Sequence, residues 1–356
     1  MAIRLRDWFA RLPRLVPSLM LGGAGGALLA WLDLPLAWML GSMFACLIAS
    51  MAGAKLTNPR PIRPPMAMVL GLAIGASFHP GLLSQLWAWS LSLSLVVPMA
   101  LLVTVAGALY FRRIAGFDPR TAVFCALPGG LSEVVLISET LEADAKRIAL
   151  VHSARIAATI SILSLAFAWL VPVPAPGAVA EAPAIALAAG QDLLLLLFVG
   201  LAGWLGARAI NMPAAAMMGP MLASAIAHGS GFVSGSMPQL AVIAAQIVFG
   251  ATIGCQFGGV RLGEIAKAVG HGLVFVVMGL AISTAIAFTL AEFMAQSPAT
   301  IVLAFSVAGA TELSLMALTL GLDAPYVVLH HFVRQLSVLL TLPLTKRIVN
   351  LLRVGA

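Results

Sequence analysis

Apolar runs long enough to cross a bilayer follow one another along almost the whole chain, with little room between them for a soluble domain. A membrane-spanning helix needs about 20 mostly apolar residues. Charged residues make up 9% of the 356, and the mean hydropathy is +1.05. A soluble domain carries about 25% charge. The sequence therefore predicts an all-α polytopic membrane protein whose surroundings are the lipid bilayer.

The chain repeats itself. A shift of 179 residues (312 minus 133) places Glu133 on Glu312. At the same shift further rare polar residues and glycines coincide in order, namely Gly130 with Gly309, Ser132 with Thr311, Asp144 with Asp323, His152 with His331 and Arg155 with Arg334. Coincidence rarely matches rare residues in order, so we infer a tandem duplication. It predicts a first membrane repeat over 1–172, a Pro/Ala-rich linker over 173–186 and a second repeat over 187–356.

Each repeat contains five runs long enough to span and one interrupted run. In the first repeat the spans are expected at about 17–32, 35–53, 64–80, 88–111 and 147–172. In the second they are expected at about 187–208, 213–228, 238–257, 270–293 and 325–345. The interrupted runs, about 120–141 and 299–320, contain Pro128-Gly129-Gly130 and Ala308-Gly309-Ala310. Because helix breakers at membrane depth are tolerated only where the backbone faces protein or a wet cavity, each interrupted run is expected to be a re-entrant or broken helix.

The distribution of Lys and Arg along the chain indicates whether the interrupted runs turn back within the membrane or cross it. If the interrupted runs turn back, each repeat has five crossings, the two repeats are inverted, and the loop cations lie on the cytoplasmic side with both termini. If the runs cross, Lys146, Arg147, Arg208, Arg261 and Lys267 move outside. The positive-inside rule favours inverted repeats, with the linker outside. The twenty Lys and Arg stand at the ends of apolar runs, which does not indicate a nucleic-acid-binding face.

Inverted repeats with broken helices are the architecture of many secondary transporters, in which half-helix ends offer backbone groups and partial charge to a solute. Glu133 and Glu312 lie just after the two breaks. A carboxylate there could carry a proton or help to coordinate Na⁺. The alternative is that it caps the downstream half-helix, as Ser132 and Thr311 could also do. One residue can serve both purposes, so both interpretations stay open.

A histidine and an arginine follow each break. His152 and Arg155 are three residues apart and share a helix face, as do His331 and Arg334. An ion pair between each arginine and the glutamate of its own repeat would make burial less costly, whereas a free arginine could bind an anionic substrate with two hydrogen bonds. Snorkelling to the headgroups is a further alternative.

Other features have structural explanations. Asp144 and Asp323 are expected to be N-caps of the helices that follow. The pairs Gly22–Gly26, Gly71–Gly75 and Gly250–Gly254 predict close helix packing. A metal site made by the histidines 152, 330 and 331 with the two glutamates would suit Zn, Fe or Cu, but no local ligand motif indicates one. No ATP-binding motif is present either, so no cofactor is expected beyond H⁺ or Na⁺.

The paired segments GGLSE (129–133) and GATEL (309–313), with the openings LPLAWMLG and MPAAAMMG, resemble those of the AbrB-duplication membrane proteins, a family also labelled ammonia monooxygenases. The resemblance covers essentially the whole chain, although the second repeat has Val307-Ala308-Gly309 where the first has Pro-Gly-Gly. It implies a protein of the bacterial inner membrane, with a link to regulation of gene expression in some members.

These observations favour a secondary transporter that moves a small anionic solute by alternating access, driven by H⁺ or Na⁺. The candidate substrate- or ion-binding residues are Gly129, Gly130, Ser132, Glu133, His152, Arg155, Gly309, Thr311, Glu312, His331 and Arg334. A membrane sensor or regulator that acts on gene expression indirectly is the second hypothesis, because no soluble basic module exists for binding DNA. A monooxygenase is a distant third, since no fingerprint for an oxygen-activating cofactor is present, and the chain is not expected to be an enzyme. A homo-oligomer is left open.

Overall fold

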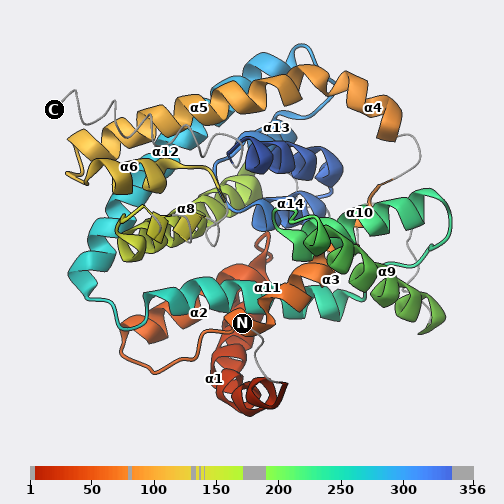
Figure 1. Ribbon diagram of the computed structural model, residues 1–356, viewed down its shortest axis with the longest axis horizontal. Coiled ribbons are helices and arrows are strands. Elements are labelled where there is room, and N and C mark those ends of the chain that lie inside the picture. The colour runs from red at the N-terminus through yellow and green to blue at the C-terminus, as the bar shows by residue number, and fades with distance from the viewer. Residues whose placement is uncertain are drawn as a thin grey trace. The chain divides into compact units, whose positions relative to one another are not determined.

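The computed structural model describes residues 5–78, 82–129, 134–135, 138–139, 141–170 and 190–338 (Figure 1). These residues form helices joined by short turns, and no β-strand occurs among them. The helices of the first half are α1 (Leu5–Ala30), α2 (Ala37–Met51), η1 (Arg60–Ile62), α3 (Arg63–Gly75), α4 (Leu82–Ala88), α5 (Ser90–Arg113), α6 (Pro119–Ala126) and α8 (Ala145–Leu170). Those of the second half are α9 (Gly190–Ala209), α10 (Ala215–Gly229), α11 (Gln239–Gly254), η2 (Cys255–Phe257), α12 (Leu262–Ala291), α13 (Pro298–Phe305), α14 (Ala310–Thr319) and a helix over 324–338.

Five of the described helical stretches are long and apolar enough to cross a membrane. They are Ser90–Arg113, Ala145–Leu170, Asp192–Ala209, Gln239–Phe257 and Leu262–Ala291. The α2 helix is a shorter apolar helix of 15 residues, which corresponds to about 22 Å at 1.5 Å per residue. The chain is therefore an all-α polytopic membrane protein, as predicted.

The helices form two compact units. Unit 1 comprises Met1–Ala76, Ser164–Val173 and Pro183–Ile265, and therefore contains α1 to α3 with α9 to α11. Unit 2 comprises Ser77–Leu163, Pro174–Ala182 and Ala266–Ala356, and contains α4 to α6, most of α8, and α12 to the helix over 324–338. Each unit thus combines helices from both halves of the chain. The two sequence repeats stay a prediction, and the linker over 173–186 lies outside the described residues.

Glycines set the distance between helices in unit 1. A Cβ atom added to Gly71 of α3 would overlap the carbonyl of Met217 in α10, and one added to Gly250 of α11 would overlap the carbonyl of Met39 in α2. The two contacts are equivalent between the halves. Gly71 matches Gly250 at the shift of 179, and Met39 matches Met217 at the shift of 178 that aligns the openings LPLAWMLG and MPAAAMMG. The same backbone contact occurs at Gly25, Gly41, Gly75, Gly203, Gly219 and Gly254. The close packing predicted for Gly71–Gly75 and Gly250–Gly254 is confirmed.

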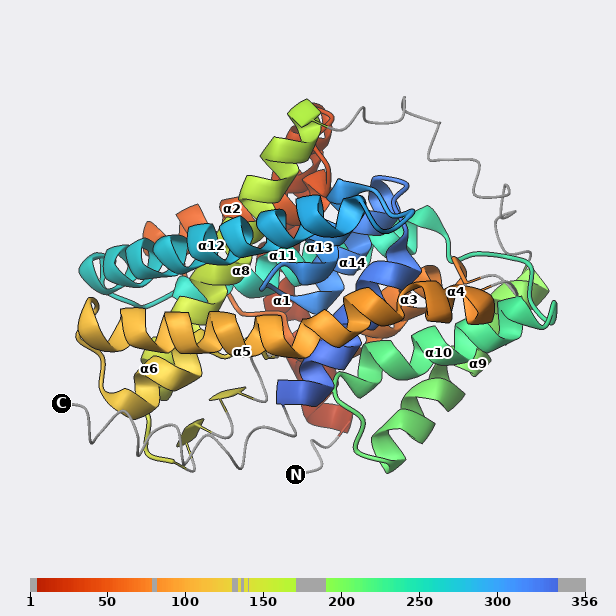
Figure 2. The same ribbon diagram turned by 90° about the horizontal axis from the view of Figure 1, so that it is seen from above.

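In unit 2, α5 and α12 lie with nearly parallel axes and opposite chain directions across the view of Figure 2, and they contact each other. A Cβ atom on Gly107 of α5 would overlap the ring of Phe275 in α12. Close by, the Tyr110 hydroxyl hydrogen-bonds Nδ1 of His271 at 2.9 Å. These contacts join the two long helices that precede the broken segments in the chain.

Candidate functional site

Both interrupted runs break where the sequence predicts. The first begins as α6, which has eight residues and a proline at its first turn, and ends before Leu127 and Pro128. The second begins as α13, also of eight residues, and continues after a break as α14, of ten residues. Eight residues extend about 12 Å and ten about 15 Å, whereas the hydrocarbon core is about 30 Å thick. None of these helices could cross it alone.

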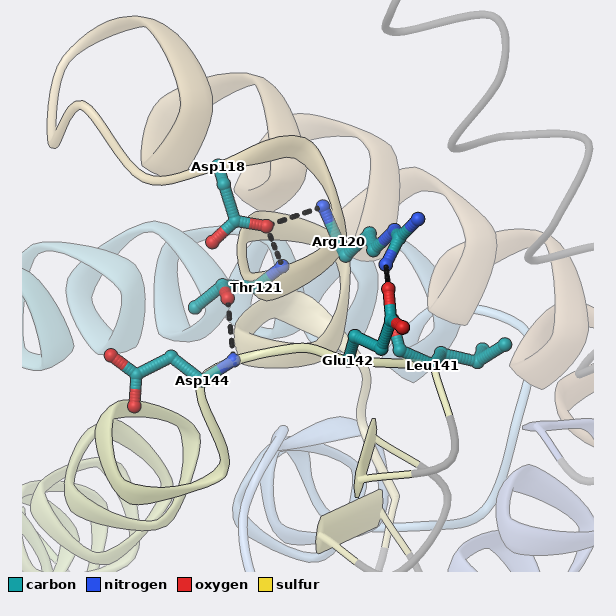
Figure 3. Close-up of polar contacts among 6 residues, drawn as sticks. All are labelled: Asp118, Arg120, Thr121, Leu141, Glu142 and Asp144. Carbon is teal, nitrogen blue, oxygen red and sulfur yellow. Dashed lines mark hydrogen bonds and ion pairs between the residues drawn. The ribbon is translucent and has the colours of Figure 1, made fainter.

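The two ends of the first broken segment meet (Figure 3). Asp118 caps α6 by accepting hydrogen bonds from the backbone N–H groups of Arg120 and Thr121. At the far end of the segment, the backbone N–H of Asp144 donates to the Thr121 hydroxyl at 3.0 Å. Arg120 also forms an ion pair with Glu142 at 2.7 Å. The chain therefore returns to the place where α6 began.

The second broken segment closes in the same way. The side-chain amide of Gln296, just before α13, donates to Oδ2 of Asp323 at 2.9 Å, just before the last described helix. Asp323 Oδ1 accepts from the backbone N–H of Tyr326, and Asp144 Oδ1 accepts from that of Arg147. The N-capping roles predicted for the two aspartates are confirmed. Both segments thus leave and re-enter at the same end.

Arg155 lies on α8 and is 2% exposed. Its Nη1 donates to the carbonyl of Leu127 at 3.0 Å and, at a longer 3.5 Å, to that of Cys125. Both carbonyls belong to the C-terminal end of α6, where the backbone has no helical partner. The guanidinium carbon also lies 5.6 Å from the centre of the Phe275 ring. Arg155 therefore caps the carbonyl end of the first half-helix.

His152 completes this cap. Its Nε2 lies 2.9 Å from the carbonyl of Phe124, and its Nδ1 lies 3.1 Å from Nη2 of Arg155. An arginine can only donate and a carbonyl can only accept. These partners therefore assign the hydrogen to Nε2 and leave Nδ1 as the acceptor, so the neutral imidazole satisfies both contacts. His152 and Arg155 act together on the last carbonyls of α6.

Arg334 is the equivalent of Arg155 in the helix over 324–338, and it is 1% exposed. It donates through Nη1 to the carbonyl of Ser306 and through Nη2 to that of Ala308 at 3.0 Å. Ser306 is the C-cap of α13 and the equivalent of Leu127, because 127 plus 179 is 306. The same capping geometry therefore occurs once in each half of the chain. These contacts add another to the alternatives that the sequence left open for Arg334, since its guanidinium donates to backbone carbonyls at the end of α13.

Glu312 lies in the first turn of α14 and is 2% exposed. Its carboxylate folds back against Gly309, the N-cap, so closely that a Cβ atom on Gly309 would overlap it. The N-cap is Gly309 itself, so Thr311, at the second helical position, does not cap this helix through the N-cap position. A glycine is needed here because the carboxylate occupies the space that a side chain would take.

The charges at the second break match the helix ends beside them. The carbonyl end of a helix carries about half a negative elementary charge and the amino end about half a positive one. Arg334 lies at the carbonyl end of α13, and Glu312 lies at the amino end of α14. The positions of Arg334 and Glu312 are therefore explained by the dipoles of α13 and α14, the two half-helices whose ends they meet.

The two arginines also influence one another. Arg155 and Arg334 both belong to unit 2 and lie close enough for their positive charges to interact. The Nε group of each is buried and has no hydrogen-bond partner among the described residues. Two buried cations with unused donors form a local environment that favours an anion.

The structure describes only part of the predicted site. The candidate side chains that it describes as buried in unit 2 are those of His152, Arg155, Glu312, His331 and Arg334. Gly129 also lies at its break, where an added Cβ would meet the Val134 side chain at 2.8 Å. Gly130, Ser132 and Glu133 lie outside the described residues. Within the described ranges, no group of three or more His, Cys, Asp or Glu is placed to hold a metal ion.

Reasoning from sequence did not identify the hydrogen-bond partners of the two arginines. They are backbone carbonyls of Leu127, Ser306 and Ala308, which carry no residue-type signal. The sequence carries only a positional signal for these partners. Each arginine comes 26 to 28 residues after these carbonyls, which lie at the end of an eight-residue helix.

The chain is similar to known proteins along nearly all of its length. A family model described as "Transition state regulatory protein AbrB" matches residues 38–350. The chain is 26% identical over 318 residues to a protein of Escherichia coli K12 named "Putative regulator AbrB", covering 89% of this chain and 91% of that protein. It is 25% identical over 347 residues to "Uncharacterized protein YhjN" of Bacillus subtilis 168, covering 91% and 90%.

Proposed function

We propose that this chain, which belongs to the AbrB family, is a secondary transporter of a small anionic solute. The observation that carries the proposal is the pair of buried guanidinium groups, one from each half, that end at the two helix breaks in unit 2. Their Nε–H groups are available to an anion, and carboxylate or phosphate oxygens are the acceptors that arginine binds best. Solute binding at broken helices is common among secondary transporters.

Two structural features support transport by alternating access. The first is the division into two compact units, which supplies the two bodies that such a mechanism moves. The second is the contrast between the units, because unit 1 is held by backbone contacts at glycines whereas unit 2 contains the broken helices. We assign the packed unit to the scaffold and the unit with the breaks to solute binding.

The return of both broken segments to their starting ends supports inverted repeats. With each segment turning back, every half has five crossing helices, and an odd number reverses the orientation of the second half. The positive-inside rule then favours N- and C-termini on the cytoplasmic side of a bacterial inner membrane. Transport would be driven by H⁺ or Na⁺, and the chain would not be an enzyme.

A membrane sensor is the second candidate. It is favoured by the name of the Escherichia coli relative, "Putative regulator AbrB". In this reading the same arginine site binds an anion, and the bound state is passed to a partner without net movement of solute. A sensor and a transporter differ in bulk uptake.

The test is uptake by vesicles that contain the purified protein, with a labelled panel of acetate, succinate, citrate, phosphate and sulfate. We expect uptake of at least one anion, and its loss in Arg155→Gln and Arg334→Gln. Arg120→Gln is the matched control, because Arg120 is half-buried at the surface end of α6 and pairs with Glu142. Uptake that survives both buried substitutions would refute the site. Thermal stabilisation by an anion without uptake would favour the sensor.

A further inference from the structure

Two of the three cysteines of the chain lie side by side in unit 1. Cys46 belongs to α2 and is 0% exposed, whereas Cys255 begins the short turn η2 at the end of α11 and is half-buried. Their side chains hydrogen-bond each other. The Cys46 thiol also donates to the carbonyl of Ser18 in α1 at 3.4 Å. The third cysteine, Cys125, belongs to α6 in unit 2.

The glycine contacts of unit 1 bring the two thiols together. Gly254 precedes Cys255, and a Cβ atom added to it would lie 2.8 Å from the Cβ of Cys46. Gly258 follows η2, so this turn is flanked by two residues whose backbone is free to adjust. A disulfide needs Cβ atoms about 3.5 to 4.5 Å apart and sulfurs about 2 Å apart. Thiols in hydrogen-bond contact at such a turn can reach this geometry by local adjustment of the turn.

The surroundings of the pair suit a disulfide better than a metal ion. Within the described ranges, no group of three or more His, Cys, Asp or Glu is placed to hold a metal. A structural zinc site needs four such ligands. The two thiols also differ in exposure, since Cys255 is half-buried and Cys46 is fully covered. This difference assigns an order of reaction, in which an oxidant meets Cys255 first and Cys46 reacts second.

We propose that Cys46 and Cys255 are a redox-sensitive pair, which a hydroperoxide converts into a disulfide that joins α2 to the end of α11. Hydrogen peroxide is small and uncharged, so it can reach a half-buried thiol. The proposal concerns unit 1 and does not depend on the proposed transport function.

The reaction has two steps. Cys255 loses its proton to water, its sulfur attacks one peroxide oxygen, and the O–O bond breaks to give a sulfenic acid and hydroxide, which takes up the proton as water. The Cys46 sulfur then attacks the Cys255 sulfur, the S–O bond breaks, and the hydroxide leaves as water with the Cys46 proton. Two thiols are thus oxidised to one disulfide, and one peroxide is reduced to two waters.

The reduced pair is expected to be the resting state. Arg261 follows η2, and the positive-inside prediction places this end of α11 on the cytoplasmic side. Cytosolic reductants keep thiols reduced and return disulfides to thiols by exchange. We therefore expect the disulfide to form under oxidative conditions and to be reversible.

The pair occurs once per chain. Ser224 is the equivalent of Cys46 at the shift of 178, and Ala76 is the equivalent of Cys255 at the shift of 179. The glycine contact itself is repeated there, because a Cβ atom on Gly75 would lie 2.5 Å from the Cβ of Ser224. The equivalent residues show which side chains this packing accepts. Cys46→Ser and Cys255→Ala are therefore the variants that should fold as the wild type does.

The test is a thiol count on the full chain in lipid nanodiscs. The protein is treated with hydrogen peroxide, blocked with N-ethylmaleimide in SDS and weighed by mass spectrometry. The untreated chain should take up three maleimides and the oxidised chain one, at Cys125, and dithiothreitol should restore all three. Peptide mapping should show a link between Cys46 and Cys255. Three maleimides after oxidation, or any other mapped product, would overturn the proposal.

Single variants test the order of the two steps. Cys46→Ser removes the second thiol, so Cys255 should stop at the sulfenic acid, which dimedone traps. Cys255→Ala should leave the covered Cys46 unmodified. Cys125→Ser is the control and should form the disulfide as readily as the wild type. A dimedone label on Cys46 in the Cys255→Ala protein would contradict the assigned order.

The cross-link also has a structural readout. It closes a loop of 209 residues (255 minus 46), and cross-links that close long loops constrain the unfolded chain most. The oxidised wild type should need more SDS to unfold than the reduced protein, and Cys46→Ser should not respond to peroxide. An equal midpoint for the reduced and the fully oxidised wild type would overturn the joining of α2 to α11.

The equivalent position allows a gain of the same property. Ala76→Cys with Ser224→Cys, in a chain that also carries Cys46→Ser, Cys125→Ser and Cys255→Ala, should form a new disulfide with peroxide. The same chain without the two new cysteines is the control. Absence of the new link would overturn the claim that the glycine contact brings the pair together.

Discussion

Replacing Gly75 by alanine is the sharpest test of how unit 1 is held together. An added Cβ atom would lie 2.5 Å from the carbonyl oxygen of Met221 and 2.5 Å from the Cβ of Ser224, both in α10. Ordinary contact between carbon atoms is about 3.5 Å. The α3 and α10 helices must therefore separate locally by about 1 Å, and the hydrogen bond from the Ser224 hydroxyl to the carbonyl of Leu72, now 2.9 Å, would lengthen.

The expected loss follows from these contacts. Overpacking costs about 1 to 3 kcal/mol, and a weakened buried hydrogen bond adds up to about 1 kcal/mol. Alanine returns about 0.5 kcal/mol of helix stability at the last residue of α3. We expect the free energy of unfolding of Gly75→Ala to fall by about 2 kcal/mol. The equivalent substitution Gly254→Ala should behave alike, because its Cβ would lie 2.8 Å from that of Cys46.

The assay is equilibrium unfolding in mild detergent by added SDS. The control is Gly270→Ala in α12, where no described heavy atom lies within 4 Å of the added Cβ. The control should be unchanged or more stable by about 0.5 to 1 kcal/mol. A Gly75→Ala protein as stable as Gly270→Ala would refute the claim that backbone contact at glycine sets the helix spacing.

Five further substitutions can be measured by the same unfolding titration. Asp118→Ala removes the acceptor of two backbone N–H groups at the start of α6, and should cost about 1 kcal/mol; Glu142→Gln, whose carboxylate is exposed, should cause no measurable change. Arg334→Lys loses the planar guanidinium whose two terminal nitrogens donate to two carbonyls. It should lower the free energy of unfolding by about 1.5 to 3 kcal/mol. Gly309→Ala should cost about 1 to 3 kcal/mol by overlap with the Glu312 carboxylate. Adding Glu312→Ala should recover part of that loss, and strict additivity in the double-mutant cycle would contradict the contact.

Much of the fold could be predicted because its signals are local. Apolar runs place most helix bounds within a few residues, as for α5, expected over 88–111 and observed as Ser90–Arg113. Pro128 marks the first break, and Asp144 and Asp323 mark the helix starts that they cap. These signals depend on neighbouring residues, so the sequence alone carries them.

What could not be predicted depends on contacts between distant segments. Nothing local indicates that α3 packs on α10 and α2 on α11, so the grouping into two units with both halves in each was not expected. The opposite charges of Arg334 and Glu312 suggested an ion pair, whereas the structure shows Arg334 donating to the carbonyl end of α13 and Glu312 in the first turn of α14. The contact between Nε2 of His330 and the Ser92 hydroxyl joins residues that are 238 positions apart in the sequence.

The mixing of the two halves within each unit has a consequence for synthesis of the chain. Gly71 meets Met217, which is 146 residues later (217 minus 71). At about 5 to 20 residues per second, a ribosome needs roughly 7 to 30 seconds to make that stretch. During this interval the glycine face of α3 lacks the α10 backbone against which it packs in the folded protein. Slowed translation between the halves therefore prolongs the period in which the nascent chain is exposed to proteolysis and misassembly.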